Sequence, residues 1–436
     1  MEKETAAVVY VQSITGQPLM PTKRCGKVRR LLKSGRAKVV RRCPFTIQLT
    51  YESGTETQPI VLGVDAGSKH VGFSACTEKE ELYSAEMRPR NDVVDLLSDR
   101  RQYRRERRSR KTRYREARFD NRVHSKPEGW LAPSVEVKIQ EHITCINRIM
   151  EILPITEVIV ETAEFDTQRL KAQEEGRPLP VGKDYQLGEM YDEYNVRQYV
   201  LKRDNNYACQ CCGNHPTEKN SVKLHVHHKE SRKTGGNAPN NLITLCKDCH
   251  KALHEGKIQL PEGKKRGKSN RDAAFMGIMR KTLVARLRSI LDIPVLETHG
   301  YITKYRREKY GIQKTHTSDA RCITGMMEAV PAAEEYLIRP VRCHNRQIFK
   351  AKILKGGKRK RNQAEHTVFG FRLWDKVRYN GQECFISGRR TTGYFAPAEL
   401  SGKKVTNSVL YKKLKLLEKA DHYLTERRMR GDGENG

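Results

Sequence analysis

One stretch of the chain, residues 208–256, gathers cysteines at the spacing that tetrahedral zinc sites use. It contains two Cys-x2-Cys pairs, Cys209 with Cys212 and Cys246 with Cys249. A third cysteine, Cys211, is an alternative member of the first pair. We choose Cys209 because its distance from Cys212 along the chain gives the Cys-x2-Cys spacing. The pattern predicts a structural zinc ion held by four cysteines.

The same stretch carries histidines and one asparagine beyond the four cysteines: His225, His227, His228, Asn241, His250 and His254. In a zinc ribbon that only folds the module, these would be spare surface residues. So many imidazoles around one unit of ββα size instead predict a second, chemically active site, with the last two histidines on a helix.

Acidic residues mark a further candidate site in three separated places. Asp65 lies inside the apolar stretch Ile60–Ala75, which is typical of two short buried strands, and a carboxylate there is costly unless it is paired or binds a metal. Glu161 ends a short apolar strand, at the strand end where ligands collect in open α/β sheets. His316 and Asp319 stand three residues apart in a predicted helix, so their side chains share one face.

Each of these acidic residues has a plainer interpretation when it is taken alone. Asp65 could start a turn, Glu161 could be a surface charge at a strand end, and Asp319 could cap its helix. Their recurrence in three stretches favours one shared site over three unrelated roles.

The most biased segment is Arg100–Arg122, with twelve Arg and Lys against three Asp and Glu and no Pro or Gly. A helix is favoured once its charge is neutralised, because like charges four residues apart oppose an isolated helix. Arginine favours bidentate contact with phosphate, so we expect nucleic-acid contact here and not a merely solvated face. The four arginines that we expect to contact nucleic acid are Arg104, Arg105, Arg107 and Arg108.

Composition supports a nucleic-acid partner. The chain of 436 residues has a formal net charge of +32, and such a surplus disfavours compaction unless a polyanion neutralises it. No apolar run approaches the roughly 20 residues that span a bilayer, and the N-terminus lacks the plan of a signal peptide. Most of the twelve cysteines are scattered, which indicates a reducing compartment. We expect a cytoplasmic protein of about two to four domains with no membrane partner.

Small β-rich units are expected at both ends of the chain. Near the N-terminus, two strand-like runs flank a short helix after Thr22, a plausible cap, and Pro18–Pro21 alone would suggest a proline turn. Near the C-terminus, residues 369–402 alternate strand-like runs with turns, and Asn380-Gly381 is a strong hairpin signal. We expect a short basic helix over residues 410–417 and disorder in the last dozen residues.

These residues together resemble the IscB family of transposon-associated, RNA-guided DNA endonucleases, over almost the whole chain. The resemblance is carried by the separated acidic motifs, the Arg-rich segment after the first of them, and the Cys/His module after the second. It includes Pro18-Leu19-Met20-Pro21, the element that names the family's PLMP domain. It also includes residues 385–390 and 411–415, which are similar to the region that reads the short motif beside the target.

The resemblance implies an α/β multidomain protein with a split RNase H-like (RuvC) core. That core has three antiparallel strands and then crossovers to parallel ones. An inserted ββα-metal HNH module, an Arg-rich bridge helix and small β-rich N- and C-terminal domains complete the expected fold. The implied RuvC metal ligands are Asp65, Glu161 and Asp319, joined by His316. Two Mg²⁺ (or Mn²⁺) ions at such a site stabilise the attacking and leaving oxygens of a phosphodiester displacement.

In the HNH module, the resemblance implies that His228 is the general base that activates water. It also implies that His227 and His250 bind a single metal ion and that Asn241 braces the loop between strand and helix. Two imidazoles suit Mn²⁺ or Zn²⁺ better than Mg²⁺.

The domain boundaries we expect follow the order of these motifs. They are residues 1–59 (PLMP domain), 60–92 (RuvC part I), 93–125 (bridge helix), 126–166 (RuvC part II), 167–199 (linker), 200–256 (HNH module with zinc site), 257–332 (RuvC part III) and 333–436 (C-terminal domain).

The implied function is guide-RNA-dependent cleavage of double-stranded DNA by a monomeric ribonucleoprotein with a guide (omega) RNA. The HNH site would cut the target strand and the RuvC site the non-target strand. Two alternatives stay open. One is an unguided nuclease acting on branched or transposon DNA. The other is a catalytically idle RNA-binding scaffold that uses only the basic surfaces.

Overall fold

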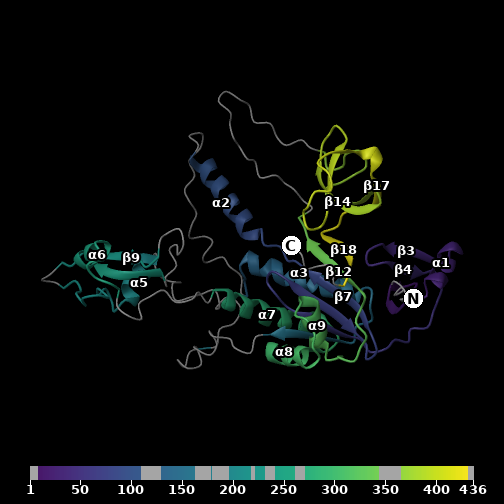
Figure 1. Cartoon of the computed structure of the whole chain (residues 1–436), viewed down its shortest axis with the longest axis horizontal. Helices are drawn as coiled ribbons and strands as arrows, with labels where there is room; N and C mark the ends of the chain where they lie inside the picture. Colours follow the sequence, from purple (N-terminus) through teal and green to yellow (C-terminus); the bar gives the residue numbers. More distant parts are fainter. Residues whose placement is uncertain are drawn as a thin grey trace. The chain divides into compact units, whose positions relative to one another are not determined.

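The computed structural model describes residues 8–109, 129–162, 178, 196–217, 221–230, 241–260, 271–342 and 365–430. The chain divides into two compact units, shown as ribbons in Figure 1. The first, here called the sheet unit, comprises Met1–Lys126, Ala132–Phe165 and Met276–Gly436. The second, here called the inserted unit, comprises Pro127–Leu131 and Asp166–Phe275. No helix in the described ranges is both long enough and apolar enough to cross a bilayer.

A seven-stranded sheet with the order β11-β8-β5-β6-β7-β12-β18 forms the centre of the sheet unit. Its strands are β5 (Val61–Asp65), β6 (Val71–Cys76), β7 (Glu81–Met87), β8 (Glu157–Thr162), β11 (Val295–His299), β12 (Glu334–Pro340) and β18 (Tyr423–Met429). β5, β6 and β7 form an antiparallel meander, and β8 and β11 add to the β5 side in parallel. This is the order of strand directions that we expected.

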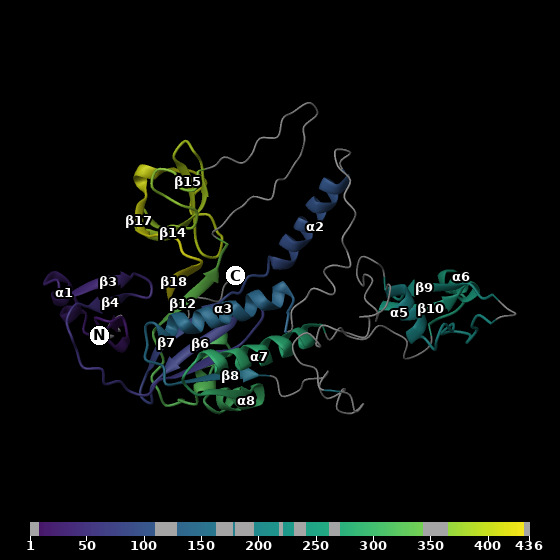
Figure 2. The same ribbon diagram turned by 180° about the vertical axis from the view of Figure 1, so that it is seen from behind.

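Helices cover both faces of this sheet, and two glycines explain how closely one of them approaches. Helix α9 (His316–Thr324) packs on β5 and β6, where a Cβ on Gly63 or Gly72 would lie 2.1 Å or 1.8 Å from a backbone oxygen of α9. Because strand residues alternate between faces, Met87 points to the other side. There its Sδ lies 3.2 Å from the Sγ of Cys145 on α3 (Pro133–Met150). Figure 2 shows β6 and β8 between α3 and α8 (Gly300–Lys309).

The N-terminal part is a four-stranded sheet with the order β2-β1-β4-β3 and one helix. Its elements are β1 (Val9–Gln12), β2 (Pro18–Thr22), α1 (Cys25–Lys33), β3 (Ala37–Arg41) and β4 (Thr46–Leu49). The PLMP stretch is therefore an edge strand, where proline is tolerated, and not a simple turn. The expected Thr22 cap is wrong: the N-cap residue is Arg24, and Thr22 Oγ1 accepts from the backbone N–H of Arg24, before the helix begins.

The C-terminal part of the chain contributes to the central sheet and also forms a second sheet. Its first and last strands, β12 and β18, pair with each other and extend the seven-stranded sheet. The disorder that we expected in the last dozen residues is therefore wrong for residues 425–429, which belong to β18, and residues 431–436 lie outside the described residues. Between them lies a five-stranded antiparallel sheet. It consists of β13 (Lys376–Tyr379), β14 (Gln382–Arg389), β15 (Tyr394–Ala398), β16 (Val409–Leu410) and β17 (Lys415–Glu418).

Two local predictions in this five-stranded sheet have opposite outcomes. Asn380 and Gly381 both have positive φ and join β13 to β14, which confirms the hairpin. The basic helix expected over residues 410–417 is wrong: only a single 3₁₀ turn, Tyr411–Lys413, forms. The chain then pairs with β13 as strand β17, because backbone pairing with the neighbouring strand outweighs local helix propensity.

Two helices complete the parts of the chain used below. α7 (Arg271–Ile290) leads from the inserted unit into the sheet unit. The Arg-rich helix α2 runs from Val93 to Ser109, and the rest of the helix expected up to Arg122 lies outside the described residues.

The inserted unit is small. It contains α5 (Val196–Arg203), the antiparallel pair β9 (Leu224–His228) and β10 (Leu242–Cys246), and α6 (Lys247–His254). Apolar side chains from α5, β9 and β10 form its core, among them Leu201, Leu224 and Leu245. The expected ββα arrangement is present.

Candidate functional sites

The sheet places the first set of acidic residues on one face. Asp65 ends β5 and Glu161 lies near the end of β8, the neighbouring parallel strand, so both stand at the carboxyl edge of the sheet. Asp65 points to the same face as Gly63, which α9 covers, and α9 itself supplies His316 and Asp319. The structure therefore brings together the four residues that the sequence nominated.

A basic side chain accompanies each carboxylate of this acidic site. His316 Nδ1 lies 2.7 Å from Asp65 Oδ2, and Arg307 Nη1 of α8 lies 2.6 Å from Asp319 Oδ1. Arg280 of α7 is 3.7 Å from Glu161 Oε1 and donates to the backbone oxygen of Ala66 at 2.8 Å. These contacts neutralise charges that would otherwise repel one another at the sheet edge.

The carboxylates of the site interact electrostatically, and this interaction shifts the pKa of Glu161. Burial raises the pKa of Glu161, the hydrogen bond from Thr303 Oγ1 at 2.8 Å lowers it, and the charges of Asp65 and Asp319 raise it further. The hydrogen bond to Asp65 raises the pKa of His316 and so favours its charged form. Carboxylate oxygens are the ligands that Mg²⁺ prefers, so the donor set fits a hard divalent cation.

Sequence reasoning missed three residues of the acidic site: Arg280, Thr303 and Arg307. Thr303 and Arg307 stand four apart on α8, a spacing that places them on one face. Their partners Glu161 and Asp319 come from other elements, however, so sequence spacing alone did not indicate these contacts.

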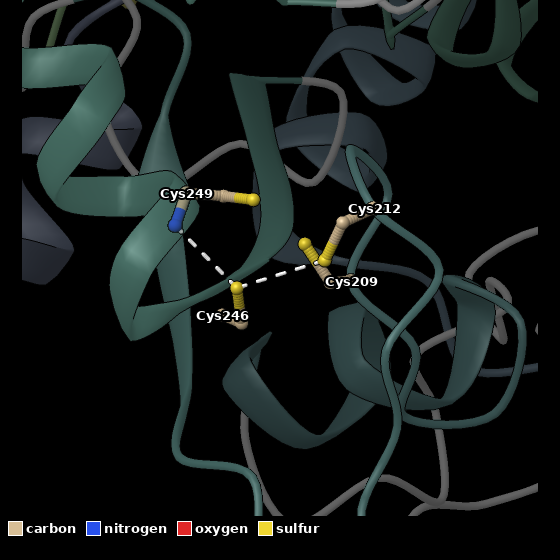
Figure 3. A group of neighbouring side chains, drawn as sticks. All are labelled: Cys209, Cys212, Cys246 and Cys249. Atoms are coloured by element: carbon tan, nitrogen blue, oxygen red, sulfur yellow. Dashed lines mark hydrogen bonds between the residues drawn. The ribbon is translucent and has the colours of Figure 1, made fainter.

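The four cysteines of the inserted unit come together as predicted (Figure 3). The sulfurs of Cys209, Cys212, Cys246 and Cys249 all lie within 4.8 Å of one another, and Cys211 is not in the group. Cys212 Sγ and Cys246 Sγ are 3.8 Å apart. A tetrahedron with zinc–sulfur bonds of about 2.3 Å has sulfur–sulfur edges of about 3.8 Å. The geometry therefore fits zinc, and the choice of Cys209 over Cys211 is supported.

A second group of possible metal ligands lies on the same unit: His227, His250 and His254, with ring nitrogens within 4.8 Å of one another. His227 comes from β9 and the other two from α6. Burial, together with the nearby histidines, lowers the pKa of His227 to about 4, which keeps it in the neutral form that binds metals. His254 had no assigned role in our prediction, although its i,i+4 spacing from His250 was visible in the sequence.

His228 ends β9, and Asn241 directly precedes β10, the strand that pairs with β9. His228 follows His227 on β9, so its side chain points to the opposite face of the strand. Asn241 is fully buried; its Oδ1 accepts from the N–H of Glu230 at 2.9 Å and its Nδ2 donates to the Glu230 oxygen at 3.3 Å. Asn241 thus joins the two ends of the loop between β9 and β10, not a loop between strand and helix as we expected.

Comparison with known families agrees with these sites. The family described as RRXRR protein, which is found in IscB-like and Cas9-like proteins, matches residues 9–186, and the pattern in its name occurs here as Arg104-Arg105-Glu106-Arg107-Arg108. The family described as HNH endonuclease matches residues 209–256, the module with both metal-ligand groups. In these two regions the chain is similar to IscB-like proteins. Its module at residues 209–256 is similar to HNH endonucleases.

No curated protein matches the IscB-like chain. Among solved structures it is similar to Streptococcus thermophilus Cas9 in complex with AGGA PAM, with 13% identity and a TM-score of 0.29 over 45% of this chain and 26% of Cas9. The complex of the same Cas9 with the AGAA PAM has 14% identity and a TM-score of 0.30, again over 45% of this chain and 26% of Cas9. A foamy viral protease-reverse transcriptase in complex with RNA/DNA hybrid has 9% identity and a TM-score of 0.14, over 65% of this chain and 37% of the viral protein. The chain thus spans about a quarter of the length of Cas9, and similarity of this extent carries no argument about function.

Proposed function

We propose that the protein is an RNA-guided DNA endonuclease in which two sites cut one strand each. One observation carries the proposal: a single IscB-like chain holds an acidic site on its central sheet and an imidazole site on its HNH module. These donor sets differ in chemistry and lie on separate compact units, as expected for two nucleolytic centres with different strands to cut.

The acidic site is assigned to the RuvC type. Its strand order, three antiparallel strands followed by two parallel ones, supports a split RNase H-like core. Asp65, Glu161 and Asp319 would hold Mg²⁺ or Mn²⁺, which when bound supplies charge stabilisation for phosphodiester hydrolysis. His316, paired with Asp65, would join these carboxylates at the site. Arg307 neutralises Asp319 and holds α8 against α9.

The imidazole site is assigned to target-strand cleavage. His227, His250 and His254 would hold one metal ion, and three imidazoles suit Mn²⁺ or Zn²⁺ better than Mg²⁺. His228 is the proposed general base. Asn241 keeps the loop after β9 closed, so it acts through the backbone that positions His228. The four-cysteine site is structural: it ties the segment after α5 to the start of α6.

Guide RNA is assigned to the basic surfaces. Helix α2, with Arg104, Arg105, Arg107 and Arg108, would lie along the phosphates of a guide–target duplex without reading bases. The PLMP sheet would help to hold the RNA, and the five-stranded C-terminal sheet would read the motif beside the target. The assembly would be a monomeric ribonucleoprotein.

The test begins with the RNA that co-purifies with the full-length protein. We expect sequencing to find one defined long RNA, and duplex DNA complementary to its guide segment then serves as substrate, with each strand carrying its own label. Asp65→Ala should abolish cutting of the displaced strand only. His228→Ala should slow cutting of the target strand only, by roughly 10²-fold or more, as expected when a general base is lost.

Other outcomes contradict the proposal in distinct ways. Cleavage without bound RNA favours an unguided nuclease, and RNA binding without metal-dependent cutting favours an idle scaffold. Wild-type cutting of both strands by Asp65→Ala would overturn the assignment of the acidic site.

A further inference from the structure

His70 belongs to none of the motifs above, yet it lies against the acidic site. It precedes β6, in the turn after Asp65. Its ring stacks on that of His316 with an interplanar angle of 1° and a distance of 5.1 Å between ring centroids. The turn is compact: a Cβ on Gly67 would lie 1.9 Å from the backbone oxygen of His70. The backbone of His70 therefore packs closely against Gly67 in this turn.

A carboxylate on the sheet holds the His70 ring itself. His70 Nδ1 lies 2.7 Å from Oε1 of Glu86 on β7, and Glu86 stands directly across the sheet from Gly72, the glycine on which α9 rests. Arg88 Nε also donates to Glu86 Oε1, at 3.2 Å. Each of the two stacked histidines thus forms a hydrogen bond through Nδ1 with a carboxylate: His316 with Asp65, and His70 with Glu86.

The stack restrains a motion that the Asp65 contact alone leaves open. The side chain of His316 is 44% exposed, and one hydrogen bond fixes one ring nitrogen but not the plane of the ring. A parallel ring at this distance favours one orientation of that plane. Aromatic pairs of this kind favour their stacked arrangement by roughly 2- to 10-fold.

We propose that His70, held by Glu86, is a positioning residue that orients the His316 imidazole for its role at the acidic site. The inference rests on the proposed function, since it assigns His70 to displaced-strand cleavage. It concerns His70 acting through His316, so it requires no contact of His70 with DNA or metal.

The test compares two substitutions of the same residue in the intact ribonucleoprotein. His70→Ala removes both the ring and its hydrogen bond, whereas His70→Phe keeps a ring that can stack. We expect H70A to slow displaced-strand cutting roughly 2- to 10-fold and H70F to recover most of that loss. Target-strand cutting, which uses the inserted unit, should be unchanged in both and is the internal control.

A second readout does not depend on cleavage. In protein with isotope-labelled histidine, the ring protons of His316 feel the ring current of His70. We expect their NMR signals, assigned with a His316→Gln variant, to move in H70A and to stay shielded in H70F. Unmoved signals, or displaced-strand cutting at the wild-type rate in H70A, would overturn the proposal. Equal loss on both strands would also overturn it, because it would assign His70 to folding. If Asp65→Ala still cuts the displaced strand, the acidic-site assignment fails, whereas the NMR comparison still reports on the histidine pair.

Discussion

Outside the acidic and imidazole sites, helix α3 carries buried residues whose pKa values are strongly shifted. Burial raises the pKa of Glu141 to about 7, although the N–H and the charge of Arg90 oppose the shift. Its Oε2 accepts from Arg90 N at 2.9 Å. One turn earlier, Lys138 donates to the oxygen of Ser68 and, at 2.6 Å, to Asn91 Oδ1. These buried groups tie the turn after Asp65 to the segment that leads into α2.

Glu141 should make folding stability depend on pH. Because its folded pKa is raised above the ordinary 4.5, its contribution is fully present below pH 4.5 and is lost as pH rises through about 7. Glu141→Gln removes this loss. The free energy of unfolding of the variant, relative to wild type, should therefore rise by about 2 kcal/mol between pH 5 and pH 8. Thermal unfolding across this range measures the difference.

The pH dependence of wild-type stability alone would not isolate Glu141, because His142 on the same helix also contributes to it. The stability of the variant must therefore be compared with that of wild type at each pH. Burial lowers the pKa of His142 to about 4, so its contribution is lost as pH falls from about 6.5 to about 4, opposite to that of Glu141. The variant-minus-wild-type difference isolates Glu141. A difference that does not change with pH would show that Glu141 is not protonated at neutral pH in the fold.

At the scale of elements, the acidic site depends on how closely α9 lies on the sheet. A Cβ at position 72 would lie 1.8 Å from the backbone oxygen of His316, and backbone cannot yield as a flexible side chain does. Gly72→Ala should therefore displace α9, cost about 1–3 kcal/mol of stability and slow displaced-strand cutting more than target-strand cutting.

Gly26→Ala is the matched control for this substitution. Gly26 is exposed in α1, and a Cβ added there would have no atom within 4 Å, so alanine should stabilise the helix by up to about 1 kcal/mol. Thermal unfolding and the strand-specific assay on both variants separate the two cases. If Gly72→Ala behaves like Gly26→Ala, the close approach of α9 does not position the site.

At the scale of the whole molecule, the charge of +32 disfavours compaction unless a polyanion neutralises it, and α2 concentrates part of this charge. Replacing Arg104, Arg105, Arg107 and Arg108 with alanine should weaken RNA binding for every guide sequence alike. Each lost phosphate contact should reduce the slope of log affinity against log salt by roughly 0.7 to 0.9. RNA affinity measured over a salt titration gives the slope.

The four-lysine variant at the same positions is the charge-matched control. Lysine keeps the positive charge but cannot make bidentate contacts, so the salt slope should stay near wild type while affinity falls. An unchanged slope and affinity in the four-alanine variant, with cleavage intact, would mean that α2 does not grip the RNA.

Short-range patterns determined much of this protein without any structure. The cysteine spacing, the strands around Asp65, the strand ending near Glu161 and the Asn380-Gly381 turn depend on residues within a few positions of one another. Each is confirmed because neighbouring residues decide it. The gathering of the acidic residues also followed, since neighbouring parallel strands end at one edge of a sheet.

Only the tertiary structure decided which distant groups complete each site. Arg280 and Arg307 meet their carboxylates across elements, His70 reaches His316 from a turn 246 positions earlier along the printed sequence, and β18 returns from the end of the chain to the central sheet. Such contacts depend on strand register and helix docking, which the whole chain sets at once. Local spacing carries no record of them, because a side chain's partner is determined by the fold and not by its neighbours in sequence.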